Sequence, residues 1–246
     1  MAKKKFSRLG AAAAGAGAGV ANGLFGAGGG MVLVPALQKL TDVEEESLFP
    51  TSVAVILPLC LVSLTVYGLR GDLPWQTAWP YLVGSGLGGL AAGIFGRRIP
   101  DSPFAPGFGH FNYMGRDPVI SLESVPVCIL VGTVLGFLSG LGIGGGSLLI
   151  LWLTAAVSMD QRMAQGVNLL FFLPAALTAC FFHSRHGRLA WKAALPAIAA
   201  GTCAAGLCAW AAAVLDTGLL KKLFGGLLLV TGLWELFGAH RRRKDK

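Results

Sequence analysis

Gly26-Ala27-Gly28-Gly29-Gly30 interrupts a long apolar stretch near the start of the chain. A second run, Gly142-Ile143-Gly144-Gly145-Gly146, interrupts another apolar stretch 116 residues later, because 144 − 28 = 116. Glycine clusters destabilise helices, since glycine loses more backbone freedom on folding than any other residue. Two such runs at equivalent places predict two helices that are each broken in the middle.

The composition around these runs is that of a membrane protein. The chain of 246 residues is 54% hydrophobic and only 13% charged, and its mean hydropathy is +0.66. Soluble domains carry roughly 25% charged residues. Several apolar runs reach the length of about 20 residues that a membrane-spanning helix needs. We therefore expect an all-α polytopic membrane protein, with the lipid bilayer as its surroundings.

The spacing of 116 residues recurs along the chain and predicts an internal duplication. Matching residues stand at this offset in many places: Pro58 and Pro174, Gly71 and Gly187, Trp75 and Trp191, Pro80 and Pro196, Phe108-Gly109 and Phe224-Gly225. We expect two parallel repeats of four segments each, a first transmembrane repeat over 9–124 and a second over 125–240. Seven clear transmembrane helices are expected, over 9–40, 51–69, 75–96, 127–157, 164–182, 189–214 and 219–238.

The fourth segment departs from this plan. Residues 98–124 are polar and contain Pro103, Pro106 and Pro118, so hydropathy does not predict a helix there. The segments with the glycine runs are in turn too long. The 31 residues of 127–157 would make a helix of about 46 Å, against a hydrocarbon core of about 30 Å. A break or a re-entrant excursion at the glycines would absorb the excess.

The net charge of +8 comes from basic residues near the two ends of the chain. This placement predicts cytoplasmic termini rather than nucleic-acid binding. With eight crossings, the side of the termini holds 14 of the 20 Lys and Arg residues, Arg70 among them, and the other side holds six, Lys39 among them. With seven crossings the count is 8 against 12. Charge therefore favours eight crossings where hydropathy favours seven.

The expected ligand site lies at the broken helices. No Asp, Glu, Lys or Arg stands in the middle of the apolar segments, apart from Glu235 near the end of the last one. A helix that restarts after a glycine run presents free N–H groups and a positive dipole end, which suits an anion. The expected substrate-binding residues are Asn22, Gly26, Gly28, Gly29, Gly30, Ser52, Gly142, Gly144, Gly145, Gly146, Ser147 and Asn168.

These residues resemble the pattern of the TauE/SafE sulfite-exporter family, also called the toluene-sulfonate uptake permease family. In that pattern a Gly-x-Gly-Gly-Gly run lies in the first helix of each of two four-helix repeats. Here Gly26–Gly30 is followed by Met-Val-Leu-Val-Pro35, and Gly142–Gly146 by Ser-Leu-Leu-Ile-Leu151. Pro50-Thr51-Ser52 and Gly166-Val167-Asn168 stand where the family has Gly-Thr-Ser. The resemblance covers the chain except about 98–125 and implies bacterial inner-membrane transport of sulfite or organosulfonates, driven by the proton motive force.

The sequence thus predicts a secondary transporter of small anions. Channel activity, a carrier for another solute and a non-transporting membrane partner protein stay open as alternatives, the last because of the degenerate fourth segment. No Ser-His-Asp set, paired carboxylates or metal-ligand cluster stands out, so we expect no enzyme, no cofactor and no metal site. The oligomeric state is open, a homo-oligomer included.

Overall fold

A computed structural model describes residues 7–27, 29–71, 73–95, 124–141, 145–185 and 189–244 of the chain. Every regular element in these ranges is helical. Gly28, Gly142 and Gly144 lie outside the described residues, as does the polar segment expected over 98–124 except Ser124. The helices are α1 Arg8–Phe25, α2 Gly29–Leu40, α3 Glu45–Leu69, α4 Trp75–Phe95, α5 Val125–Gly140, α6 Gly145–Leu151, the π-helical turn η2 Trp152–Ala156, α7 Gln161–Arg185, α8 Trp191–Ala212 and α9 Thr217–Lys244.

The helix starts follow the spacing found in the sequence. The helices α2, α3 and α4 start at residues 29, 45 and 75. The helices α6, α7 and α8 start at residues 145, 161 and 191, which is 116 residues later in each case. α3 and α7 also have the same length of 25 residues.

The first glycine run reverses the chain between α1 and α2. Gly26 ends α1 in the left-handed conformation, with φ at 61°, and its N–H donates to the Asn22 carbonyl over 2.8 Å. Further along, Gly10 lies against Leu40 and Gly17 lies against Val32, so the two helices are antiparallel. The segment 9–40 is therefore broken as expected. It does not cross the bundle, however, because the left-handed glycine turns α2 back beside α1.

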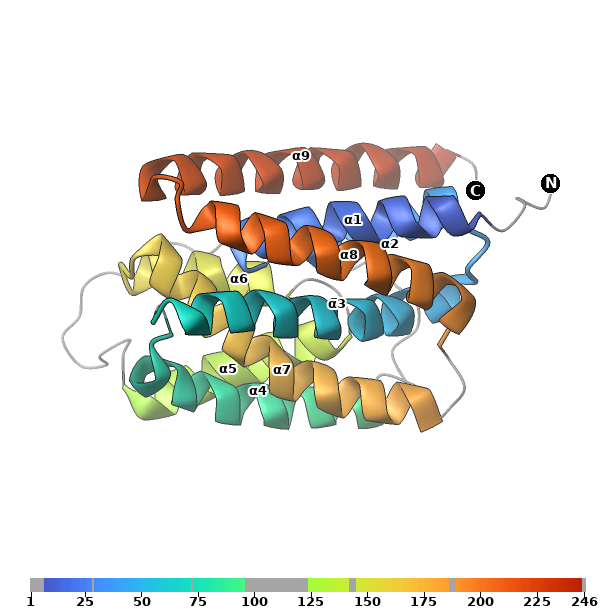
Figure 1. Cartoon of the computed structure of the whole chain (residues 1–246). Coiled ribbons are helices and arrows are strands. Elements are labelled where there is room, and N and C mark those ends of the chain that lie inside the picture. Colours follow the sequence, from blue (N-terminus) through green and yellow to red (C-terminus); the bar gives the residue numbers. More distant parts are fainter. Residues whose placement is uncertain are drawn as a thin grey trace.

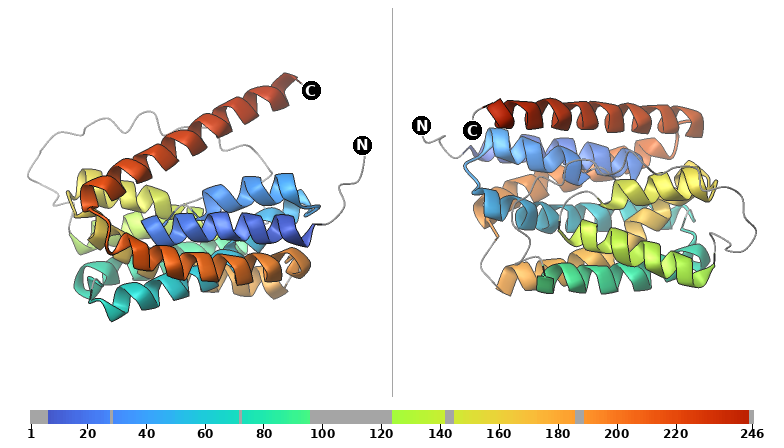
Figure 2. Two further views of the ribbon diagram at one scale, coloured as in Figure 1. Left: turned by 45° about the horizontal axis from the view of Figure 1, so that its top comes forward. Right: turned by 180° about the vertical axis from the view of Figure 1, so that it is seen from behind.

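The second glycine run, of which Gly145 and Gly146 are described, lies between α5 and α6. Gly145, the first residue of α6, lies against Leu135 and Ser139 of α5. Figure 1 shows α6 running back toward the end of the bundle from which α5 comes. The two hairpins, α1–α2 and α5–α6, open toward opposite ends of the bundle, and their tips meet near its middle (Figures 1 and 2). Of the two possibilities left open by the sequence, a break or a re-entrant excursion, the hairpins correspond to the re-entrant excursion.

Small residues hold the hairpins in the bundle. Gly15 and Gly19 of α1 lie directly on Ala197 and Gly201 of α8, too close for a Cβ atom at either glycine. Close backbone approach of this kind is how helices associate where lipid removes the hydrophobic driving force. α5 packs on α4 in the same way, with Gly136 against Ser85. The first helix of each expected repeat thus packs on the third helix of the other.

α4 and α5 run parallel although they follow each other in the chain. Gly132 of α5 lies against Tyr81 of α4, and Gly140 lies against Ala92, so residue numbers increase in the same direction along both helices. The end of α4 and the start of α5 therefore lie at opposite ends of the bundle. Both termini of the described chain lie at the end where the α1–α2 hairpin opens (Figure 1).

Three helices within the described residues are long and apolar enough to span a bilayer, namely α3, α7 and α8. Two shorter apolar helices occupy Val125–Gly140 and Gly145–Ala156. These two are the arms of the second hairpin, which explains why neither has the length of a span. Of the seven expected spans, three therefore meet the length and composition of a membrane-spanning helix in this part of the chain, and the others stay predictions.

Candidate functional site

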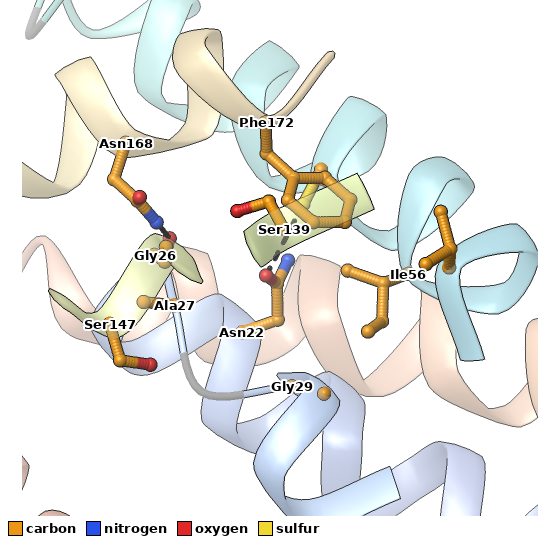
Figure 3. Close-up of a pocket in the computed structure, with 13 residues that line it drawn as sticks. Asn22, Gly26, Ala27, Gly29, Ile56, Ser139, Ser147, Asn168 and Phe172 are labelled. Atoms are coloured by element: carbon orange, nitrogen blue, oxygen red, sulfur yellow. Dashed lines mark hydrogen bonds between the residues drawn. The ribbon is translucent and has the colours of Figure 1, made fainter. Parts of the chain in front are cut away.

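A cavity of about 30 Å³ lies between the tips of the two hairpins. Such a volume holds roughly two water molecules. Figure 3 shows the labelled residues around it, contributed by both hairpins and by the spanning helices α3 and α7. The lining residues are Asn22, Gly26, Ala27, Gly29, Gly30, Val53, Ile56, Cys60, Ser139, Gly146, Ser147, Asn168 and Phe172. None of these side chains carries a formal charge.

Asn22 fastens the first hairpin to α3. Its Nδ2 donates to the Ser63 hydroxyl over 3.2 Å, and its Oδ1 accepts from the Cys60 thiol over 3.4 Å. The side chain is buried. Because both polar atoms of the amide have partners on α3, Asn22 positions the end of α1 at the cavity rather than offering free ligand atoms.

Asn168 of α7 connects the two hairpin tips. Its Nδ2 donates to the Gly26 carbonyl over 2.5 Å (Figure 3). Its Oδ1 has no hydrogen-bond partner within the described residues, although the residue is buried. A Cβ atom added at Gly146 would lie 2.9 Å from this oxygen, so glycine leaves room for the amide at the tip of the second hairpin.

Two serine hydroxyls of the second hairpin also lack partners at this cavity. Ser139 in the last turn of α5 is 2% exposed, and Ser147 at the start of α6 is 3% exposed. Neither Oγ has a hydrogen-bond partner within the described residues. An unpartnered buried polar group costs about 1–3 kcal/mol, so such groups indicate a water, an ion or a ligand in the functional state.

Helix starts supply backbone donors on the same wall. α2 begins at Gly29, and the helix 145–156 begins at Gly145. The first N–H groups of a helix have no partner inside it and carry the positive end of the helix dipole. Gly29, Gly30 and Gly146 all line the cavity. Backbone and hydroxyl donors thus converge where no cationic side chain is present.

The structure brings together most of the residues that the sequence nominated. Lining the cavity are Asn22, Gly26, Gly29, Gly30, Gly146, Ser147 and Asn168. Gly145 is packed behind them against Ser139. Ser52 is not a lining residue, because its hydroxyl donates to the Phe49 carbonyl over 2.8 Å and its neighbour Val53 faces the cavity instead.

Sequence reasoning missed Ser139 and Cys60. A signal for Ser139 existed, because it is a lone hydroxyl just before the second glycine run, as Asn22 is a lone amide just before the first. Cys60 had no such signal, since a cysteine in an apolar segment is usually a small buried hydrophobe. Within the described ranges no group of three His, Cys, Asp or Glu side chains could hold a metal ion.

Comparison with known proteins places this arrangement in a family. The family model described as "Sulfite exporter TauE/SafE" matches the chain twice, over residues 1–113 and 113–235. A curated protein of Bacillus subtilis (strain 168), "Probable membrane transporter protein YunE", is 24% identical over 214 residues. That alignment covers 72% of this chain and 78% of the relative. No solved structure matches. The two matches of the family model cover nearly all of the chain, which therefore belongs to the sulfite exporter TauE/SafE family of membrane transporters.

Proposed function

We propose that this protein is a secondary transporter of a small oxyanion, sulfite or an organosulfonate, across the bacterial inner membrane. The observation that carries the proposal is the cavity between the hairpin tips, where Ser139, Ser147 and the starts of two helices supply donors without a charged side chain. The transporter role itself follows from the family. The substrate is our inference from the chemistry of the cavity, together with the family's description.

The donors and acceptors of the cavity suit an oxyanion that still carries a proton. Backbone N–H groups and the two serine hydroxyls can donate to anionic oxygens. The Asn168 Oδ1, to which no group of the described residues donates, can accept from an O–H of the ligand. Hydrogensulfite offers both kinds of group, whereas the sulfonate group of an organosulfonate has no O–H, so the Asn168 oxygen favours hydrogensulfite between the two. A fully deprotonated dianion has no O–H to donate, so the Asn168 oxygen would repel it and would stay without a hydrogen bond.

The opposed hairpins support alternating access. Each hairpin reaches the middle of the bundle from a different end, so the two tips meet at one site (Figure 2). Transporters built from inverted repeats carry their substrate near the bilayer midplane between broken helices, and rock one repeat against the other. We therefore propose inverted repeats in place of the parallel repeats expected from the sequence. The small volume of the cavity, about 30 Å³, favours a carrier over an open channel.

The basic residues support cytoplasmic termini. The ends of α1, α2, α7, α8 and α9 that lie at the end of the bundle with the termini (Figure 1) contain eight basic positions of the described ranges: Arg8, Lys39, Arg185, Lys192, Arg241, Arg242, Arg243 and Lys244. The other end has four: Arg70, Arg162, Lys221 and Lys222. Lys39 and Arg70 have exchanged sides relative to the sequence-based count, because the first hairpin does not cross. The excess of 8 over 4 follows the positive-inside rule.

Flux measurements on the reconstituted full chain test this function. Proteoliposomes are loaded with radiolabelled sulfite, and efflux is followed with and without a proton gradient. A carrier of the proposed kind gives saturable flux that the gradient accelerates. Replacing both serines, Ser139→Ala with Ser147→Ala, lowers the flux, whereas Thr202→Val leaves it unchanged, because Thr202 bonds only to carbonyls of its own helix. Flux that does not saturate would instead indicate a channel, and absence of flux with all sulfur oxyanions would refute the proposal.

A further inference from the structure

A second, smaller cavity lies at the end of the bundle opposite the termini. It measures about 10 Å³ and is lined by Tyr67, Arg70, Arg162, Ala212 and Ala213. These residues come from the end of α3, the start of α7 and the end of α8, where those helices meet (Figure 1). The volume is that of about one water molecule, so the cavity is too small for an oxyanion in this conformation.

The two arginines at this cavity have no carboxylate partner within the described residues. The Arg162 guanidinium donates to the Leu215 carbonyl over 2.5 Å, and that of Arg70 lies 3.5 Å from the Trp210 carbonyl. Two acidic side chains of the described residues near this end of the bundle, Asp160 and Asp216, accept hydrogen bonds from backbone groups. Asp160 accepts from the backbone N–H of Arg162 itself, and Asp216 accepts from backbone N–H groups at the start of α9. The lining of the cavity within the described residues therefore holds two guanidinium groups and no carboxylate, which suits an anion.

A polar stripe on α7 leads from this cavity to the one between the hairpin tips. Gln161, Gln165 and Asn168 stand four and three residues apart, so they share one face of the helix. All three are buried. The side-chain amide nitrogens of Gln161 and Gln165 have no acceptor within the described residues. Burying hydrogen-bond donors without partners on a helix of a membrane protein costs free energy. Such donors therefore indicate a pathway for a polar solute.

Gln165 lies between the two cavities. Its Oε1 accepts from the Tyr67 hydroxyl over 2.8 Å, and Tyr67 lines the outer cavity. On its other side, Gln165 is so close to Gly26 of the hairpin tip that a Cβ there would lie 2.9 Å from the glutamine Cβ. The Tyr67–Gln165 hydrogen bond therefore separates the outer cavity from the central one.

The stripe has no equivalent on α3, the counterpart of α7. The residues 116 positions earlier are Glu45, Phe49 and Ser52, and the counterpart of Arg162 is Glu46. An acidic start and a phenylalanine thus replace the arginine and the buried glutamines. Since the described bundle has the polar, cationic route at one end only, the route is not a by-product of the duplicated sequence.

We propose that the cavity at Arg70 and Arg162 is an anion vestibule, which concentrates the oxyanion at the end of the bundle opposite the termini and passes it along Gln165 to the central cavity. The vestibule rests on the proposed anion transport but is a separate site. The two arginines attract anions in general and do not distinguish one anion from another. The Tyr67–Gln165 pair is the gate, because it closes the only polar connection that the described residues show between the two cavities.

The vestibule can be tested without knowledge of the substrate. Ala213→Cys places a thiol on its wall, and the rates of modification by a negatively and a positively charged methanethiosulfonate are compared on the purified full chain. The ratio of the two rates is corrected for the reaction of the chain without this cysteine. We expect the negative reagent to be favoured, and Arg70→Gln with Arg162→Gln to lower the ratio about tenfold, which corresponds to roughly 1.4 kcal/mol. Lys221→Gln with Lys222→Gln is the matched control, because both lysines are exposed at the same end of the bundle.

Sulfite flux gives the second measurement. The arginine double variant is expected to raise the half-saturating sulfite concentration about tenfold for entry from this end and to leave the maximal flux unchanged. A reagent ratio that the arginine substitutions do not alter overturns the vestibule, even where the wild-type protein transports sulfite. A lowered ratio in a protein without sulfite flux supports an anion vestibule and refutes sulfite as the substrate. If the lysine control lowers the ratio of the two rates as much as the arginine substitutions do, the effect comes from the general surface charge. That outcome also overturns the proposal.

Discussion

Asn168 and Gly26 are 142 residues apart in the chain, yet the asparagine Nδ2 donates to the glycine carbonyl over 2.5 Å. This hydrogen bond joins α7 to the turn of the first hairpin. The carbonyl belongs to the one non-helical stretch between α1 and α2, so no helix partner satisfies it. The bond therefore holds the tip of the hairpin at the cavity.

Asn168→Leu should uncouple the hairpin tip from α7. The variant loses one buried hydrogen bond, worth about 0.6 kcal/mol in a membrane protein on average, and leaves the Gly26 carbonyl without a donor. We expect the melting temperature to fall by a few degrees and anion flux to fall by at least tenfold. Thermal unfolding in detergent and flux in liposomes measure the two effects. Wild-type flux in Asn168→Leu would show that the bond has no part in transport.

Gly19→Leu should destabilise the bundle strongly. A side chain at Gly19 would collide with the backbone of Gly201 on α8, which cannot move without separating the helices. Overpacking of this kind costs about 1–3 kcal/mol or more. Gly226→Ala on α9 is the control, because nothing lies within 4 Å of a Cβ atom at that position. The unfolding midpoint in denaturant should fall for the first variant and stay or rise for the second. Equal midpoints would contradict the close packing of α1 on α8.

The hairpin can be recognised by cysteine labelling. Ser7→Cys precedes α1 and Asp42→Cys follows α2, and both positions lie at the end of the bundle that holds the termini. An impermeant thiol reagent should label both cysteines from the same side of the membrane. A single span over 9–40 would place them on opposite sides. Labelling of the two cysteines from different sides would therefore exclude the re-entrant hairpin.

Tyr67→Phe should open the gate of the vestibule. The substitution removes the hydroxyl that donates to Gln165 and keeps the aromatic ring. We expect charged reagents to modify Ala213→Cys faster and anions to leak faster without a gradient. Each rate should rise by a factor of about three to ten, because one hydrogen bond contributes roughly 1 kcal/mol. Unchanged reaction rates and unchanged leak would show that this bond is not a barrier.

The sequence predicted the positions of the helices better than their directions. The offset of 116 residues located α2, α3 and α4 relative to α6, α7 and α8, because glycine, proline and tryptophan residues recur at this offset in both halves. The break at Gly26 followed from the cost of glycine in helices. The reversal of the chain at Gly26 did not follow from that cost, because a glycine run permits a kink, a restart or a turn equally well. Only the contact of Gly10 with Leu40 decides among them.

The residues of the candidate site were likewise predicted only in part. Asn22, Ser147 and Asn168 were found because polar residues in apolar segments are few and these three stand near the breaks or at repeat positions. Ser52 was nominated by the repeat alone, and the hydrogen bond to Phe49 takes its hydroxyl away from the cavity. The vestibule was not foreseen, because Arg70 and Arg162 are far apart in the chain and become neighbours only when α3, α7 and α8 pack.

The central claim is that the hairpin tips bind the transported anion. Equilibrium binding of radiolabelled sulfite to the purified full chain tests it most directly, with the double variant Ser139→Ala, Ser147→Ala compared with Thr202→Val. Hydrogen bonds to a charged ligand are worth about 1.5–3 kcal/mol each, so the account predicts that the double variant binds at least tenfold more weakly and that Thr202→Val binds like the wild type. Equal affinity in all three proteins would contradict the account.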